Sequence, residues 1–169
     1  EVLRFVILSA HYRSEQNFSK DLLDSAWRSL DSLYGYLRGM KSSTPSLNQT
    51  GEGYRALLDD LNTPMAISEL HRIAKKMHSA QGIEQQTLQS ELLGLAGLMG
   101  LLQQDPESWF THARGSDDIT KEEVEDMIAK RQQSKIDKDY AGADEIRQAL
   151  LDRGVVLEDS REGTTWRRN

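Results

Sequence analysis

The sequence predicts a mainly α protein, in which a helical bundle is followed by a small C-terminal domain made of a helical hairpin and a β-hairpin. Leucine, alanine and aromatic residues recur at helical spacing over much of residues 2–102. Helix-capping residues precede several of these stretches and the helices expected after residue 118. Two short runs rich in β-forming residues flank a turn near the C-terminus.

The first two helices follow from apolar patterning. Residues 2–10 have the character of a buried helix, and because the chain starts with Glu1 instead of Met, we expect a further part of the protein to precede it. Ser19 is placed to cap a second helix that ends near Gly39. The apolar face of this second helix comprises Leu22, Leu23, Ala26, Trp27, Leu30, Leu33, Tyr34 and Leu37.

The middle of the chain alternates turn-forming and helical stretches. Residues 40–53 contain turn formers without a period, which predicts an exposed linker. A short helix follows at residues 54–61, and Thr63 can cap the next one with Pro64 at its first position. Residues 88–102 are dense in leucine and predict a central helix, closely approached by its neighbours at Gly94, Gly97 and Gly100.

The last part of the chain carries strong local signals. Thr120 and Glu123 have the spacing of a capping box, which starts a helix that runs to about Lys135. Asp139 caps a second helix and Gly154 closes it. The runs at residues 155–157 and 164–166 then form a hairpin.

Composition excludes several classes of function. The net charge of −6 excludes a generally basic surface, so any RNA contact must be local. The chain has no cysteine, and therefore no disulfide and no thiol nucleophile, which suits a reducing cytoplasm. Its apolar runs are too short to span a bilayer. Phosphate loops and nucleophile elbows are absent, and the spacing of the histidines predicts no metal site: His11, His71, His78 and His112.

The C-terminal stretch mixes cations with aromatic residues, as RNA-binding surfaces do. Tyr140 and Trp166 are interleaved with Lys135, Lys138, Arg147, Arg153, Arg161, Arg167 and Arg168. Aromatic faces can stack on unpaired bases while the cations bind phosphates. On residue types alone, an ordinary hairpin with these aromatic side chains in its core remains an alternative.

Five blocks of sequence resemble bacterial cysteinyl-tRNA synthetases, in their C-terminal tRNA-binding portion. KDYAGADEIR at 138–147, GVVLED at 154–159 and GTTWRR at 163–168 look like the C-terminus of that family. LSAHYRS at 8–14, followed by NFS at 17–19, looks like its segment just after the catalytic half, and DDLNTP at 59–64 looks like the start of its helical bundle. The resemblance therefore covers nearly the whole chain.

The resemblance implies an organisation and a function. Residues 1–41 would be the helices after the catalytic half, which contact the tRNA stem and begin the bundle, and 42–53 a linker. Residues 54–116 would form a DALR-like helical bundle of the anticodon-binding domain, and 117–169 the small anticodon-reading domain. The partner would be tRNA(Cys), with no DNA or membrane, bound by a monomer in the cytoplasm. This class I synthetase uses ATP and zinc in its catalytic half; we expect no cofactor and no catalytic residue in this chain.

The resemblance also implies site residues. Tyr140 stands where an aromatic ring can stack on an anticodon base, and Asp144 and Asp159 stand where carboxylates accept hydrogen bonds from base edges. Lys135 replaces a common arginine and lacks its planar fork. The supporting contacts would come from Trp166, Arg167 and Arg168, and the contacts to the tRNA body from His11, Tyr12 and Arg13.

A second class of function stays open at this point. Charged helical hairpins of this kind also resemble the UVR-type motif of DNA-repair proteins, which would make the chain a protein-interaction module with no RNA role. That motif explains neither the hairpin ending at Trp166-Arg167-Arg168 nor the block at His11-Tyr12-Arg13.

Overall fold

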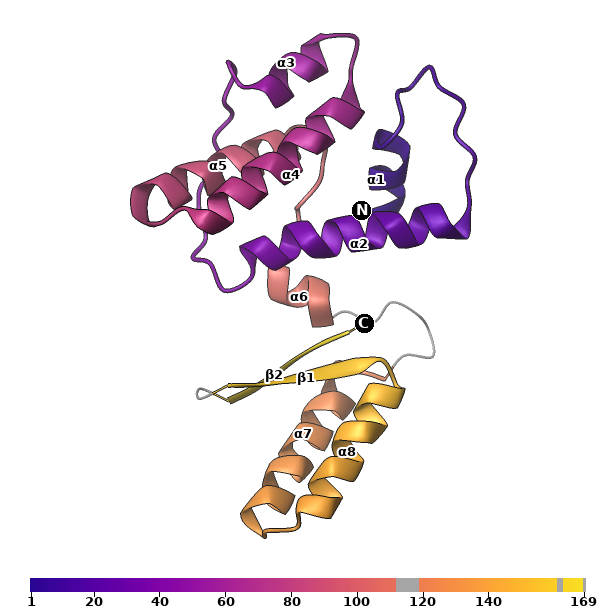
Figure 1. Cartoon of the computed structure of the whole chain (residues 1–169), viewed down its shortest axis with the longest axis vertical. Helices are drawn as coiled ribbons and strands as arrows, with labels where there is room; N and C mark the ends of the chain where they lie inside the picture. The colour runs from indigo at the N-terminus through magenta and orange to yellow at the C-terminus, as the bar shows by residue number, and fades with distance from the viewer. Residues whose placement is uncertain (112–118, 161–162, 169) are drawn as a thin grey trace. The chain divides into compact units, whose positions relative to one another are not determined.

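The computed structural model describes residues 1–111, 119–160 and 163–168, and the chain divides into two compact units, Glu1–Pro106 and Glu107–Asn169 (Figure 1). The structure is mainly helical with one antiparallel β-hairpin near the C-terminus, which confirms the predicted fold class. No helix in the described part of the chain is long and apolar enough to cross a membrane. The four-part division with limits at 41, 53 and 116 stays a prediction.

The first unit is a set of helices packed through their apolar faces. In chain order they are α1 (Val2–Leu8), α2 (Lys20–Leu37), α3 (Glu52–Leu58), α4 (Thr63–Ser79) and α5 (Gly82–Leu98), and α6 (Pro106–Thr111) begins where the unit ends. Helix α4 packs against α2, α3 and α5, and α1 packs against α2. The fully buried centre includes Leu30, Leu33, Tyr34, Leu70, Met77 and Leu92.

The hydroxyl of buried Tyr34 has hydrogen-bond partners inside this core. The hydroxyl donates to Glu1 Oε2 at 2.9 Å and accepts the Gln104 N–H at 3.1 Å. Glu1 also accepts the Leu102 N–H at 2.7 Å. Burial raises the pKa of Tyr34 far above its ordinary value. These bonds hold the segment after α5 against α2.

Two helix starts test the capping predictions. The Ser19 side chain accepts the Leu22 N–H, as predicted. The prediction for α4 was wrong by one residue: Asn62 is the cap, because its Oδ1 accepts the Met65 N–H at 3.2 Å and Thr63 is already helical. Both residue types cap well, so the sequence alone does not choose between them.

The prediction for the leucine-rich helix was wrong at both ends. Helix α5 starts at Gly82 and stops at Leu98, because Gly100 and Leu102 have φ of +65° and +57°, which no right-handed helix continues. Close approach occurs at Gly94, where an added Cβ would lie 2.4 Å from the Ser46 carbonyl oxygen. The Ser46 N–H also donates to the Ser90 carbonyl at 2.8 Å, so the segment predicted as an exposed linker packs against α5 here.

The second unit contains the predicted helical hairpin and β-hairpin. Helices α7 (Lys121–Ile136) and α8 (Tyr140–Asp152) lie side by side, and strands β1 (Val155–Ser160) and β2 (Gly163–Arg168) cross one end of the pair (Figure 1). The capping box is confirmed: Thr120 Oγ1 accepts the Glu123 N–H at 3.2 Å, and Glu123 Oε2 accepts the Thr120 N–H at 2.9 Å. Asp139 caps α8 as predicted.

Strand alternation decides which hairpin residues face the helices. The buried core of this unit comprises Ile119, Val124, Leu150, Val155, Leu157 and Trp166. Asp159 follows Leu157 by two residues, and Thr164 precedes Trp166 by two, so both lie on the face that packs on the helices. Asp159 and Thr164 are also paired across the antiparallel ladder. The hairpin therefore presents a carboxylate and a hydroxyl together toward the helices.

Candidate functional site

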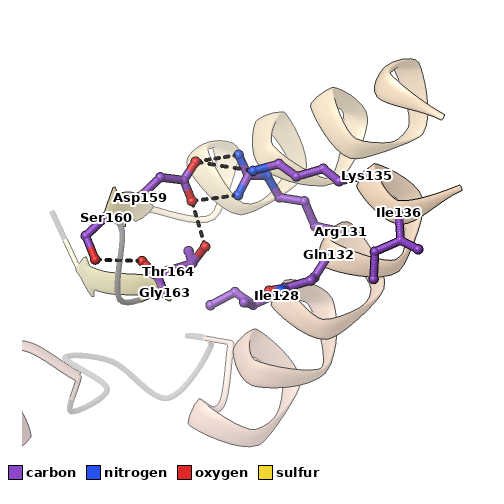
Figure 2. A pocket seen from close by; sticks show the side chains of 9 residues that line it. All are labelled: Ile128, Arg131, Gln132, Lys135, Ile136, Asp159, Ser160, Gly163 and Thr164. Atoms are coloured by element: carbon purple, nitrogen blue, oxygen red, sulfur yellow. Dashed lines mark hydrogen bonds and ion pairs between the residues drawn. The ribbon is translucent and has the colours of Figure 1, made fainter. Parts of the chain in front are cut away.

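A pocket of about 500 Å³ lies in the second unit, between α7 and the turn end of the β-hairpin (Figure 2). Its lining comprises Ile128, Arg131, Gln132, Lys135, Ile136, Asp159, Ser160, Gly163 and Thr164. The residues from α7 recur every three or four positions, which places them along one side of that helix. The pocket thus combines an apolar wall with a charged centre.

Asp159 is the centre of the polar contacts in this pocket. Its Oδ1 accepts hydrogen bonds from Arg131 Nη1 at 3.0 Å and from Thr164 Oγ1 at 2.6 Å. Its Oδ2 accepts from Arg131 Nη2 at 2.9 Å, and Lys135 Nζ lies at 3.5 Å (Figure 2). The arginine therefore holds the carboxylate through a two-bonded fork.

The pair of Arg131 and Asp159 crosses from the core to the surface. The Arg131 side chain is 6% exposed, whereas that of Asp159 is 45% exposed. The Arg131 guanidinium, and next the Thr164 hydroxyl, hold the pKa of Asp159 well below its usual range. The same bond raises the pKa of Arg131. Asp159 is therefore a carboxylate at neutral pH, which can accept hydrogen bonds but not donate them.

In this pocket the structure brings together Lys135 and Asp159, two of the predicted anticodon-binding residues. Lys135 is 43% exposed and its contact with Asp159 is long for a hydrogen bond. Tyr140 and Asp144 lie four residues apart at the start of α8, and both are exposed, Tyr140 to 65%. Neither lines the pocket, but the Asp144 charge contributes to the raised pKa of Arg131.

The residues at the end of β2 have different placements. Trp166 is 6% exposed and belongs to the core, so its ring face is not open to a base. Arg168 is buried, donates to the carbonyls of Thr111 and Ile119, and lies 5.6 Å from the Trp166 ring centroid. Arg167 stays partly exposed and donates to Glu158 Oε1 at 3.0 Å. Trp166 and Arg168 are thus placed to support the domain.

The upstream residues His11, Tyr12 and Arg13 all meet Asp60. Tyr12 Oη donates to Asp60 Oδ1 at 2.7 Å, and Arg13 Nη2 lies 3.2 Å from the same oxygen. His11 Nε2 lies 3.1 Å from the Asp60 carbonyl oxygen. The rings of His11 and Tyr12 stack at 4.8 Å, and the Arg13 guanidinium lies 5.1 Å from the Tyr12 ring. We call these four residues the Asp60 cluster.

Asp60→Ala is expected to lower the pKa of the Tyr12 phenol. The hydrogen bond to Asp60 is the largest cause of its raised pKa, because that bond favours the protonated phenol. Ultraviolet titration of Asp60→Ala, with a Tyr12→Phe variant subtracted to isolate this tyrosine, measures the change. An unchanged titration would contradict the cluster. Asp59→Ala is the control, because the Tyr12 hydroxyl donates its hydrogen bond to Asp60, the next residue along the chain.

The histidines form no metal site in the described residues. His71 Nε2 lies 2.8 Å from Ser29 Oγ, and burial lowers the pKa of His71. His78 lies against the Tyr36 ring, and His112 lies outside the described residues. Within residues 1–111, 119–160 and 163–168, no three histidine or acidic side chains converge into a metal-binding group. The described residues therefore do not fit a zinc ion.

Arg131 and Thr164 were not predicted as site residues from the sequence. The missing signal was geometric: Asp159 is on the core-facing side of its strand, and a carboxylate there requires a donor from the helix that covers it. Arg131 precedes Lys135 by one helical turn and so faces the same way.

Two family models match the chain. One, described as a DALR domain, matches residues 54–103, and the other, described as a cysteinyl-tRNA ligase anticodon binding domain, matches residues 117–167. The chain therefore belongs to the class of anticodon-binding proteins found in tRNA ligases. It is 47% identical over 171 residues to the cysteine–tRNA ligase of Saccharophagus degradans, covering 99% of this chain and 37% of the relative.

Other relatives agree with this match. The cysteine–tRNA ligase of Idiomarina loihiensis is 42% identical over 175 residues, and that of Rhodospirillum centenum 41% over 169 residues, each covering 99% of this chain and 37% of the relative. The chain belongs to the cysteine–tRNA ligase family of class I aminoacyl-tRNA synthetases, as the sequence blocks predicted, and it comprises the anticodon-binding portion. It spans little more than a third of the length of these relatives.

Proposed function

We propose that this chain binds the anticodon arm of tRNA(Cys), as a monomeric part of a cytoplasmic ligase that joins cysteine to this tRNA. The ATP and zinc of that reaction would be bound by the catalytic half. The observation that carries the proposal is the match of residues 117–167 to an anticodon-binding domain, which contains a pocket with an ionised carboxylate beside a lysine. Nothing in the geometry favours the protein-interaction alternative.

The placement of the side chains supports distinct roles in this proposal. The exposed Tyr140 ring can stack on an unpaired base, and the carboxylates of Asp144 and Asp159 can accept from base N–H groups. Lys135 and Arg167 remain partly exposed and can bind phosphates. Trp166 and Arg168 would act indirectly, by stabilising the hairpin that carries Asp159.

The Asp60 cluster would contact the body of the tRNA. His11, Tyr12 and Arg13 are held together on one acid, with Tyr12 and Arg13 exposed. Their exposed edges offer a cation and an aromatic ring to the sugar–phosphate backbone. We also propose that the chain divides into four parts after residues 41, 53 and 116, as the resemblance to the family implies.

The chain is expected to bind tRNA(Cys) more tightly than the same tRNA with an altered anticodon. The net charge of −6 leaves only local phosphate contacts, so binding should depend on base contacts more than on charge. A filter-binding or gel-shift titration at a fixed salt concentration compares the two RNAs. Equal affinities would disprove anticodon recognition.

Tyr140→Ala is expected to weaken tRNA binding by about 1–3 kcal/mol, the usual contribution of an aromatic side chain stacked on a base. Tyr140→Phe is the matched control, because it keeps the ring face and removes only the hydroxyl. It should bind as the unmodified chain does. If the alanine variant binds equally well, Tyr140 makes no stacking contact.

A further inference from the structure

The contacts of Asp159 leave few acceptor positions open. A carboxylate offers about four lone-pair directions, two on each oxygen. Arg131 and Thr164 occupy both directions of Oδ1 at 3.0 and 2.6 Å. Arg131 occupies one direction of Oδ2 at 2.9 Å, and among the described residues the remaining direction carries only the 3.5 Å contact with Lys135. A donor entering the pocket would therefore bind at Oδ2 in the place of Lys135.

The two strong partners of Asp159 differ from Lys135 in their freedom to move. Arg131 is buried between the helix and the hairpin, and its planar fork fixes the plane of the carboxylate. Thr164 is the ladder partner of Asp159, so its hydroxyl is positioned by the strand pairing. Lys135 is a flexible and partly exposed side chain whose contact with Asp159 is long. Displacing Lys135 would cost little free energy, since such exposed pairs contribute little.

Stabilisation of the fold alone is a poor explanation for the ion pair between Arg131 and Asp159. Buried ion pairs often contribute no more than an apolar pair of similar volume, because removing the charges from water is costly. The Nε of Arg131 is buried without a hydrogen-bond partner in the described structure, which adds to that cost. The fork does provide a fixed orientation for a carboxylate that is half exposed to the pocket.

We propose that Arg131 and Thr164 are positioning residues for anticodon recognition: they hold the Asp159 carboxylate so that one acceptor position on Oδ2, beside Lys135, faces the pocket and receives an N–H group of an anticodon base. This inference rests on the proposed function. The base displaces Lys135 from Oδ2, and the freed ammonium remains close enough to donate to an acceptor of the same nucleotide. Neither Arg131 nor Thr164 needs to touch the RNA.

Arg131→Lys tests this proposal, because lysine keeps the charge and loses the fork. The quantity measured is the ratio of the dissociation constants for tRNA(Cys) with an altered anticodon and with its own anticodon. The variant should reduce this ratio about 10-fold, in the range expected for loss of one directed base contact. Lys130→Arg, a conservative change at an exposed residue of α7 that does not line the pocket, is the control and should leave the ratio unchanged.

A double-mutant cycle separates positioning from a structural role. If Arg131 acts through Asp159, then Arg131→Lys should have no further effect on the ratio in an Asp159→Asn background. A loosened fold would instead weaken the binding of both RNAs and add to the effect of Asp159→Asn. A reduced ratio that is additive with Asp159→Asn would overturn the proposal, as would an unchanged ratio in a folded Arg131→Lys chain.

Thr164 provides a second test that leaves the buried arginine in place. Thr164→Val removes the hydroxyl at constant shape and should reduce the same ratio, by less than Arg131→Lys. Thr164→Ser restores the hydroxyl and should restore the ratio. Circular dichroism establishes whether the Arg131→Lys chain is folded. If it is not folded, the comparison of Thr164→Val with Thr164→Ser tests the proposal instead. Equal ratios of dissociation constants for these two variants would overturn it. An unmodified chain that fails to distinguish the two RNAs refutes the proposed function itself, whereas a discriminating chain with unaffected variants refutes only the positioning role.

Discussion

Replacing Gly94 by alanine is expected to lower the free energy of unfolding of the Glu1–Pro106 unit by about 2 kcal/mol or more, near the upper part of the range for overpacked sites. The added Cβ would lie 2.4 Å from the Ser46 carbonyl oxygen, 2.5 Å from its carbon and 2.9 Å from the Leu47 nitrogen. These are backbone atoms, which cannot turn away as a flexible side chain can. The chain at Ser46 must move off α5, and the Ser46–Ser90 hydrogen bond weakens with it.

Gly97→Ala is the matched control on the same helix. Gly97 is exposed, and a Cβ added there meets nothing within 4 Å. Because alanine is the better helix former by about 1 kcal/mol, this substitution should leave the unit unchanged or stabilise it. Native-state amide hydrogen exchange of α4 and α5 measures the two effects in this unit. Changes of the same sign and size at both positions would contradict the close contact at Gly94.

These two glycines also show where prediction from the sequence ended. Both stand in the same leucine-rich pattern three residues apart, and the pattern predicted close packing at each. The difference between them comes from the 40–53 segment, which passes over one and not the other. A contact between segments far apart in the chain leaves no local signal. The ends of α5 were missed for a related reason, because the left-handed Leu102 is held by the Glu1 carboxylate.

The second unit was predicted far better, because its signals are local. A capping box, an Asp cap and two β-rich runs each fix their own element within a few residues. The resemblance then drew attention to Lys135 and Asp159, which the structure brings together. Arg131 was not predicted as a site residue, because an arginine in a charged helix normally lies in solvent. Only the alternation along β1 shows that Asp159 faces this helix and requires a cation there.

Asp159→Ala is expected to lower the free energy of unfolding of the second unit by about 2 kcal/mol. Removing one partner of a fully buried ion pair typically costs about 3–5 kcal/mol, because the other charge is left unpaired. We expect less here, since Arg131 is 6% exposed but Asp159 is 45% exposed and partly solvated already. Glu158→Ala is the control: the adjacent acid pairs with the partly exposed Arg167, and its loss should cost no more than about 0.5 kcal/mol.

The pH dependence of this difference follows from the direction of the pKa shift. Arg131 and Thr164 lower the pKa of Asp159 in the folded chain below the value of about 3.9 that an unperturbed aspartate has. The stabilisation by Asp159 is therefore complete above that value and is lost as the pH falls below it. Hydrogen exchange of α7 and α8 in the unmodified chain and in Asp159→Ala should differ fully at pH 6 and converge in acid. A difference that persists unchanged below pH 3 would mean that packing, and not the ionised carboxylate, holds Arg131 in place.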